Sequence, residues 1–131
     1  MKRRTFLTAA SATAAATIAA SSLSSCSDGL LKSGEILHTV IFDLKHAVGS
    51  EPAEKFLADG YAILTKIAGV RDFQVFRQCS PKNDFQYGFF MRFDSRADFD
   101  AYTAHPDHAR FVTERWDTEV SRFQESDFQT R

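Results

Sequence analysis

The stretch ILHTVIFDL, at residues 36–44, decides the fold. Its side chains alternate between two faces, and both faces are largely apolar. One face carries His38, Val40, Phe42 and Leu44, and the other carries Leu37, Thr39, Ile41 and Asp43. An apolar pattern on both sides is typical of a strand whose sheet is covered on both faces. The segment therefore predicts a strand that is covered on both sides.

The sequence that follows predicts a helix and then two strands. The helix is expected to begin after the N-cap Ser50, with Pro52 in its first turn, and to stop at Gly69. Strands are expected over residues 70–79 and 85–93, because apolar side chains alternate there. The later strand places Phe85, Tyr87, Phe89, Met91 and Phe93 on one face and Gln86, Gly88, Phe90 and Arg92 on the other. Aromatic side chains therefore lie on both of its faces.

The last third of the chain predicts an interrupted helix and a final strand. Ser95 is expected to begin the helix in a capping box with Asp98. Pro106 breaks this helix and is well placed at the start of a second piece over residues 107–116. The final strand is expected over residues 119–128.

This order of elements predicts a ferredoxin-like α+β fold, in which four antiparallel strands carry helices on one face. Helices cover only one face of such a sheet, yet the first and third strands are apolar or aromatic on both. The bare face would expose a patch larger than the few hundred Å² that monomers usually tolerate. We therefore expect a homodimer whose two sheets pack together as a closed α+β barrel, which also protects the edge strands.

Residues 1–25 predict a secretory signal, with a basic head, a weakly apolar stretch and no acidic group. Arg3 and Arg4 resemble the core of a twin-arginine signal, whose pathway carries folded proteins across a membrane. Residues 23–26 resemble a bacterial lipobox, in which the cysteine receives a lipid, and cleavage after the small residues near Ala20 is the alternative. We therefore expect an exported protein of the cell envelope or periplasm, anchored to a membrane through lipid on Cys26.

This leader sets the remaining boundaries of the chain. Residues 26–34 are short, polar and punctuated by glycine, which predicts a tether. The folded domain is expected over residues 35–131, long enough for one thin core. If Cys26 carries lipid, Cys79 has no partner for an intrachain disulfide, so the fold must be stabilised by packing.

The composition argues against several classes of function. The chain has 16 basic and 17 acidic side chains, and three of the basic ones lie in the leader. The domain is thus mildly acidic, whereas a nucleic-acid-binding protein needs a basic surface. The sequence contains no glycine-rich phosphate loop. His105 and His108 are three residues apart, but Pro106 lies between them and no third ligand follows at a characteristic spacing. Neither a metal site nor a cofactor is expected.

Four short segments resemble the stress-responsive A/B barrel (Dabb) family of dimeric α+β barrels. They are HTVIF at residues 38–42, IAGV at 67–70, FDS at 93–95 and YTAHPDH at 102–108. The resemblance covers about residues 35–128, nearly the whole domain. It implies the same fold and the same dimer as the alternation of the strands.

The resemblance also implies residues of a site. A few plant members look like polyketide cyclases that use the tyrosine and second histidine of this motif as an acid/base pair. The matching residues are Tyr102 and His108, with His38 in the same pocket, although Tyr102 and His38 also fit ordinary core positions. His105 is expected to cap the helix after Pro106. The ligand pocket is expected to comprise His38, Phe42, Phe76 and Phe90, which would suit a flat apolar molecule.

Three interpretations of function follow. The first is an exported, lipid-anchored homodimeric barrel that binds a small apolar or aromatic molecule, with no established catalysis. The second is a lyase or cyclase, with His108 as the base, Tyr102 as the hydrogen-bond donor and His38 as the orienting residue. The third is a monooxygenase-like or haem-handling barrel.

Overall fold

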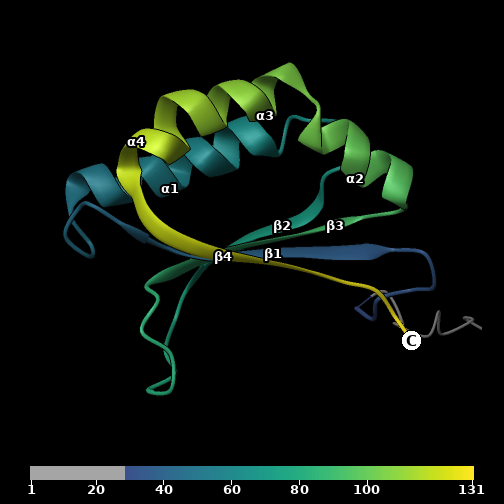
Figure 1. Cartoon of the computed structure of the whole chain (residues 1–131), viewed down its shortest axis with the longest axis horizontal. Coiled ribbons are helices and arrows are strands. Elements are labelled where there is room, and N and C mark those ends of the chain that lie inside the picture. Colours follow the sequence, from purple (N-terminus) through teal and green to yellow (C-terminus); the bar gives the residue numbers. More distant parts are fainter. Residues whose placement is uncertain (1–28) are drawn as a thin grey trace, which may run out of the picture.

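A computed structural model describes residues 29–131 of the chain. They form an antiparallel sheet with a layer of helices on one face (Figure 1). The strands are β1 (Ile36–Leu44), β2 (Arg71–Arg77), β3 (Tyr87–Phe93) and β4 (Val120–Phe128), in the order β2-β3-β1-β4. β1 thus lies between β3 and β4. The predicted ferredoxin-like α+β fold is confirmed.

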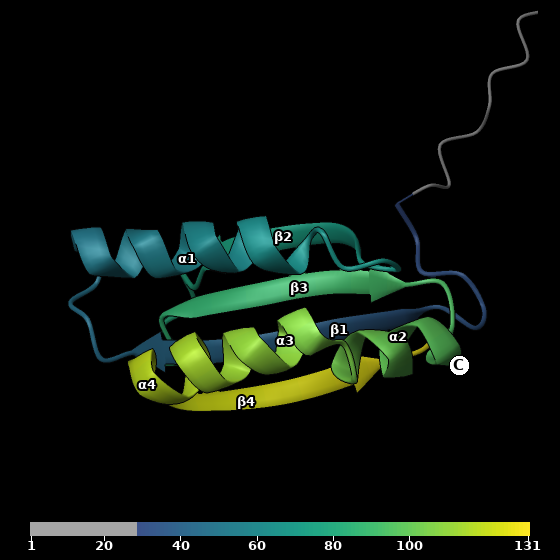
Figure 2. The same ribbon diagram turned by 90° about the horizontal axis from the view of Figure 1, so that it is seen from above.

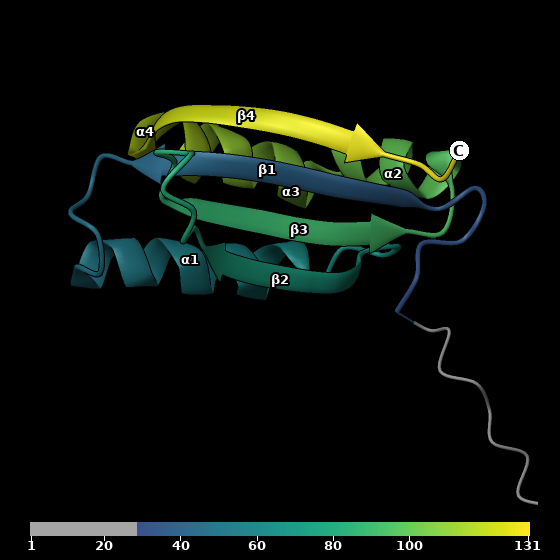
Figure 3. The same cartoon turned by 90° about the horizontal axis from the view of Figure 1, so that it is seen from below.

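The helical layer is divided between the two halves of the sheet. Its elements are α1 (Glu51–Leu64), α2 (Arg96–Thr103), α3 (Pro106–Phe111), the π-helix η1 (Val112–Trp116) and α4 (Asp117–Glu119). Figure 2 shows α1 over the β2–β3 half and α3 with α4 over the β1–β4 half. Figure 3 shows the opposite face of the sheet, over which none of these helices lies.

Helix α1 begins where expected but ends earlier. Ser50 occupies the N-cap position, yet its hydroxyl is buried and makes no capping hydrogen bond. The helix ends at Leu64, and Gly69 lies beyond it with φ +90°, in the turn that leads to β2. Gly60 permits the close approach of α1 to the sheet, because a Cβ atom there would lie 2.9 Å from the Phe89 ring.

The caps of α2 and α3 follow from two local hydrogen bonds. The Asp98 amide donates to the Ser95 hydroxyl at 3.2 Å, so the Ser95 half of the predicted capping box is confirmed. The Asp107 amide donates to His105 Nδ1 at 3.1 Å, and Pro106 occupies the first turn of α3. His105 therefore caps the helix, as predicted.

The segment predicted as one helix over residues 107–116 is divided. The α-helical part ends at Phe111, the π-helix follows, and α4 leads directly into β4. A π-helix widens the turn and changes which side chains face the sheet. Here Trp116 packs on Phe42, with ring centroids 4.9 Å apart. Hydrophobic periodicity alone does not predict this change of pitch.

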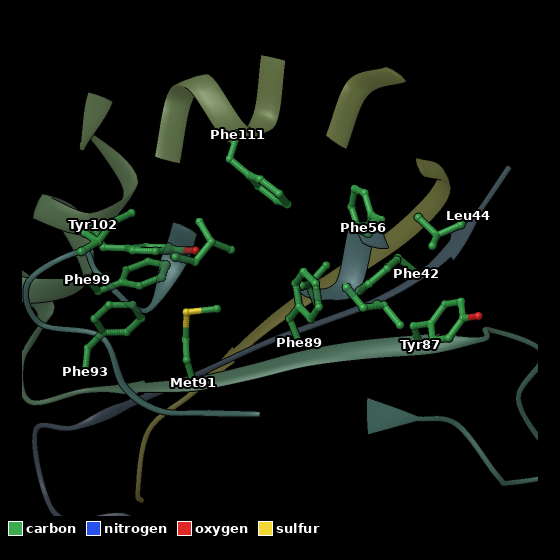
Figure 4. Close-up of a cluster of buried hydrophobic side chains, with 14 of the residues drawn as sticks. Phe42, Leu44, Phe56, Tyr87, Phe89, Met91, Phe93, Phe99, Tyr102 and Phe111 are labelled. Atoms are coloured by element: carbon green, nitrogen blue, oxygen red, sulfur yellow. The ribbon is translucent and has the colours of Figure 1, made fainter. Parts of the chain in front are cut away.

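The core lies between the sheet and the helices and consists largely of aromatic rings (Figure 4). Phe42 and Phe89 meet edge to face, with ring centroids 4.8 Å apart, and Phe56 stacks on Phe89. Such pairs add about 0.5–1.5 kcal/mol beyond the free energy of area burial. The side chains that are at most 1% exposed are Ile36, Phe42, Ala53, Phe56, Phe89, Met91 and Phe93.

The bare face of the sheet is also apolar. Register and alternation place Leu37, Ile41, Phe76, Phe90 and Phe128 on this face. Of these, Phe76 is 41% exposed and Phe128 is 52% exposed, and Phe76 packs edge to face on Phe90. The sequence prediction that β1 and β3 are apolar on both faces is therefore confirmed.

The predicted signal peptide over residues 1–25, with Arg3, Arg4 and the lipidation site Cys26, lies outside the described residues. Of the predicted tether, residues 29–34 are described, and the Arg92 guanidinium donates to the carbonyl of Gly29 at 2.5 Å. Within residues 29–131, no helix has both the length and the apolar character needed to cross a bilayer.

Candidate functional site

A cavity of about 280 Å³ lies between the sheet and the α3–η1 segment. Strands β1, β3 and β4 supply its floor, and α2, α3 and η1 supply much of its wall. The apolar lining comprises Val40, Leu64, Phe89, Met91, Phe111, Val112, Trp116 and Phe123. The polar lining comprises His38, Tyr102, His108, Asp117 and Glu125. An apolar cavity with a few convergent polar groups is the usual form of a small-molecule site.

The central strand positions His38 opposite the edge strand β4. His38 is paired with Asp127 in the register of β1 and β4, so both side chains lie on the helix-covered face. His38 Nδ1 and Asp127 Oδ1 are 2.6 Å apart, a charge-assisted hydrogen bond. Because a carboxylate only accepts hydrogen bonds, the Nδ1–H of His38 donates to Asp127. The bond fixes the ring, and in the neutral imidazole it leaves Nε2 as an acceptor.

Tyr102 and His108 form the other polar pair of the cavity. They come from α2 and α3, and their ring centroids are 4.5 Å apart. Figure 4 shows the Tyr102 ring between α2 and the sheet, with its hydroxyl oxygen directed towards the interior of the molecule. The contact therefore brings a phenol and an imidazole to one wall of the cavity.

Burial sets the protonation of this pair. It raises the pKa of Tyr102, with a further contribution from the negative charge of Glu125. Burial also lowers the pKa of His108, and the nearby imidazoles of His38 and His105 lower it further. At neutral pH Tyr102 is therefore a protonated donor and His108 is a neutral imidazole.

The structure brings together only some of the residues expected in the pocket. His38, Tyr102 and His108 all line the cavity. Phe42 lies on the same side of the sheet but is fully buried in the core and does not line it. Phe76 and Phe90 lie on the bare face, because they alternate with the inward-facing residues of β2 and β3. The four expected residues therefore do not form one pocket within a single chain.

Sequence reasoning missed much of the cavity, especially the contribution of β4. Phe123 and Glu125 line it, and Asp127 holds His38 in place. Phe123, Glu125 and Asp127 are spaced two residues apart. This spacing is visible in the sequence and indicates one face of a strand. Trp116 was also missed, because its position depends on the π-helix.

One group of side chains in the described part of the chain has the composition of a metal site. The donor atoms of His38, Glu125 and Asp127 all lie within 4.8 Å of one another. However, the 2.6 Å between His38 Nδ1 and Asp127 Oδ1 is shorter than the ~3.3 Å that separates two ligands of a tetrahedral zinc ion. The pair is arranged for a hydrogen bond. His105 Nδ1 is likewise occupied by the helix cap.

The chain belongs to the stress responsive A/B barrel (Dabb) domain family, whose model matches residues 36–130. It is similar to a Dabb-family protein with a ferredoxin-like fold from Mesorhizobium loti, with 46% sequence identity and a TM-score of 0.74. That match covers 75% of this chain and 98% of the other. No curated protein matched the sequence.

Two more distant structures show the same fold. A dimeric protein of unknown function from Bacteroides fragilis is 20% identical, with a TM-score of 0.59 and coverage of 77% of this chain and 100% of that one. A hydroxynitrile lyase from Passiflora edulis is 18% identical, with a TM-score of 0.65 and coverage of 76% and 96%. At such identities the likeness is one of fold.

Proposed function

We propose that this protein is an exported, lipid-anchored homodimeric barrel that binds a small apolar or aromatic molecule in the cavity between its sheet and helices. The observation that carries the proposal is the cavity itself, where aromatic walls surround His38, Tyr102 and His108. Export and anchoring rest on the twin-arginine and lipobox patterns of the leader.

The bare face of the sheet supports the dimer. Phe76 and Phe128 are about half exposed there, beside Leu37, Ile41 and Phe90. A second copy placed on this face buries the same residues in both chains, as a two-fold interface requires. The relative from Bacteroides fragilis is described as dimeric, which agrees with this arrangement.

Native mass spectrometry of the mature protein, gently extracted from the envelope of the exporting cell, tests binding and assembly together. The expected result is a dimer that carries a reproducible additional mass, released on unfolding. A monomer would overturn the assembly. A dimer without additional mass, which also fails to bind apolar or aromatic compounds, would overturn ligand binding.

The lipid anchor has its own test, with the second cysteine as a matched control. Cys26→Ser is expected to remove the lipid mass and release the protein from the membrane fraction. Cys79→Ser should leave both unchanged, since Cys79 is an exposed free thiol within the folded domain. Replacing Arg3 and Arg4 by lysine should block export. A Cys26→Ser protein that stays in the membrane fraction would exclude the anchor.

A second candidate function, acid/base catalysis of the lyase or cyclase type, is favoured by the contact between Tyr102 and His108. Neutral His108 would take a proton from a carbon next to a carbonyl group. The electron pair of that C–H bond forms a C=C bond, and the π electron pair of the C=O bond moves to the carbonyl oxygen, where the Tyr102 hydroxyl stabilises the developing charge. His38, held by Asp127, orients the substrate.

Substitution of the pair separates catalysis from binding. His108→Ala and Tyr102→Phe should each lower turnover of an accepted substrate about 10²- to 10⁴-fold and spare the dimer. Unchanged turnover would exclude this assignment. The monooxygenase-like or haem-handling interpretation remains a prediction, and an absorption spectrum of the purified protein tests its haem form directly.

A further inference from the structure

Among the ionisable side chains that line the cavity, acidic groups are not balanced by lysine or arginine. Asp117 and Glu125 supply carboxylates, whereas no lysine or arginine of residues 29–131 lines the cavity. Two carboxylates outside the cavity lining are neutralised, since Arg115 forms ion pairs with Asp59 and Glu119. Within residues 29–131, neither Asp117 nor Glu125 has a lysine or arginine within ion-pair distance, and the closest basic atom to Glu125 is His38 Nδ1 at 3.9 Å.

The histidines of the cavity do not reverse this balance. His38 already forms a short hydrogen bond with the carboxylate of Asp127. His108 is held neutral at pH 7, because burial lowers its pKa. The field inside the cavity is therefore negative under ordinary conditions, and an anionic ligand would meet no compensating positive group from the described part of the chain.

The aromatic walls of the cavity also favour a positively charged ligand. Trp116 and Phe123 meet edge to face at 5.6 Å, next to Glu125 on the same face of β4. Phe123 is 54% exposed, so this end of the cavity is open to solvent. The face of an aromatic ring attracts cations, and tryptophan does so most strongly.

The Tyr102 hydroxyl is a further polar group that a ligand in the cavity can contact. Tyr102 is only 2% exposed, and its hydroxyl has no hydrogen-bond partner within residues 29–131 while it lines the cavity. A phenol oxygen accepts hydrogen bonds as well as donating them. A ligand N–H group can therefore donate to this oxygen.

We propose that the cavity takes a small organic cation, with an aromatic or apolar body and a protonated amine. The body packs against Trp116 and Phe111, and the ammonium group lies at the Glu125 end. This inference rests on the proposed function and narrows its ligand to one class. It also predicts discrimination against carboxylates with the same apolar body.

The protein contains its own reporter of binding. Trp116 is the only tryptophan of the chain and lines the cavity, so selectively excited tryptophan fluorescence follows occupancy directly. Three probes share a phenyl body and differ in charge: 2-phenylethylamine, 2-phenylethanol and 3-phenylpropionate. EDTA in every titration excludes metal-mediated binding at His38, Glu125 and Asp127. At neutral pH the amine should bind about tenfold more tightly than the alcohol, and the carboxylate more weakly than both.

Variants of Glu125 assign the preference to the cavity. Glu125 is about half exposed, so Glu125→Gln should leave the fold intact while lowering the affinity for the amine to that for the alcohol. Glu125→Lys should reverse the preference in favour of the carboxylate. Glu114→Gln is the matched control, because Glu114 is exposed on η1 and does not line the cavity. It should leave all three affinities unchanged.

The outcomes separate this inference from the proposed function. Alcohol binding as tight as amine binding would overturn the charge preference and leave the pocket as a site for apolar molecules. An amine preference unaffected by Glu125→Gln would place the cation elsewhere and overturn the inference. If none of the three compounds changes the fluorescence of Trp116, this inference and the proposed binding of small aromatic molecules both fail.

Discussion

On the helix-covered face of the sheet, Phe42, Phe89 and Phe93 are at most 1% exposed, whereas on the bare face Phe76 and Phe128 are 41% and 52% exposed. The same residue type therefore serves two purposes on the two sides of one sheet. Covered rings form the core and the floor of a cavity within one chain. Bare rings form an apolar surface, which a second chain covers in the proposed dimer. Aromatic content alone does not distinguish these roles, because the difference depends on which face the helices cover.

The largest expected effect is a loss of stability on substitution of a core residue of the helix-covered face. Phe89→Ala should lower the free energy of unfolding by about 3–5 kcal/mol, because it leaves a cavity where four aromatic neighbours now contact the ring. Urea denaturation followed by circular dichroism measures this. Phe76→Ala, on the bare face, should cost less than about 1 kcal/mol at concentrations where the chain is monomeric. Equal losses would contradict the division between the faces.

The next largest expected effect is a weaker dimer on substitution of a residue of the bare face. Phe90→Glu should weaken the proposed dimer at least about 30-fold, since it places a charge at the centre of the apolar surface. Sedimentation velocity over a range of concentrations measures the change. Val48→Glu is the matched control, because Val48 is an exposed apolar residue in the loop before α1, away from the sheet. A dimer that tolerates Phe90→Glu would exclude this face as the interface.

The sequence predicts the fold almost completely, because alternation is visible in each strand that contacts the core. His38, Phe42 and Phe89 recur on one face, and Ile41 and Phe90 on the other, where the structure has them. Motif positions also sufficed to group Tyr102 with His108. Local patterns thus carry both the architecture and the centre of the candidate site.

The rest of the site depends on information that local patterns lack. Placing Phe76 in the pocket required knowing which face of β2 the helices cover, and alternation gives two faces without saying which is which. Finding Asp127 opposite His38 required the register between β1 and β4, which lie 89 residues apart in this contact. The wide turn before Trp116 follows from packing on the sheet and leaves no periodic signal.

A smaller effect on the helix-covered face is a dependence of stability on pH through His108. Because the pKa of His108 is lower in the folded protein than its ordinary value of 6.5, the unfolded chain binds a proton first as the pH falls. The contribution of His108 to stability should therefore be complete above about pH 6.5 and decline below it, with a slope of at most about 1.4 kcal/mol per pH unit.

His108→Gln should flatten this dependence, which denaturation curves between pH 7.5 and about 5 would reveal. The difference between the two proteins isolates His108 from the other histidines. Direct NMR titration of the imidazole provides a second measurement. A folded-state pKa above 6.5 would contradict the burial of this ring in the cavity.

The smallest effect concerns a residue that belongs to neither face. His105→Ala should cost up to about 1 kcal/mol, because it removes the acceptor for the Asp107 amide at the start of α3. His105→Asn should restore most of this, since asparagine is a strong N-cap residue. Thermal unfolding measures both. Neither variant should change ligand binding, and a change in binding would assign His105 to the site.

Because of the π-helix at Val112–Trp116, the shape of the cavity depends on the number of residues in this segment. A π-helix is related to an α-helix by the insertion of one residue, and the anchor points at its two ends stay where the sheet needs them. Deleting one residue here would tighten the turn and rotate Trp116 and Asp117 relative to the cavity, with the strands unchanged. Lineages that gain or lose a single codon at this point would thus acquire a differently shaped cavity on the same barrel.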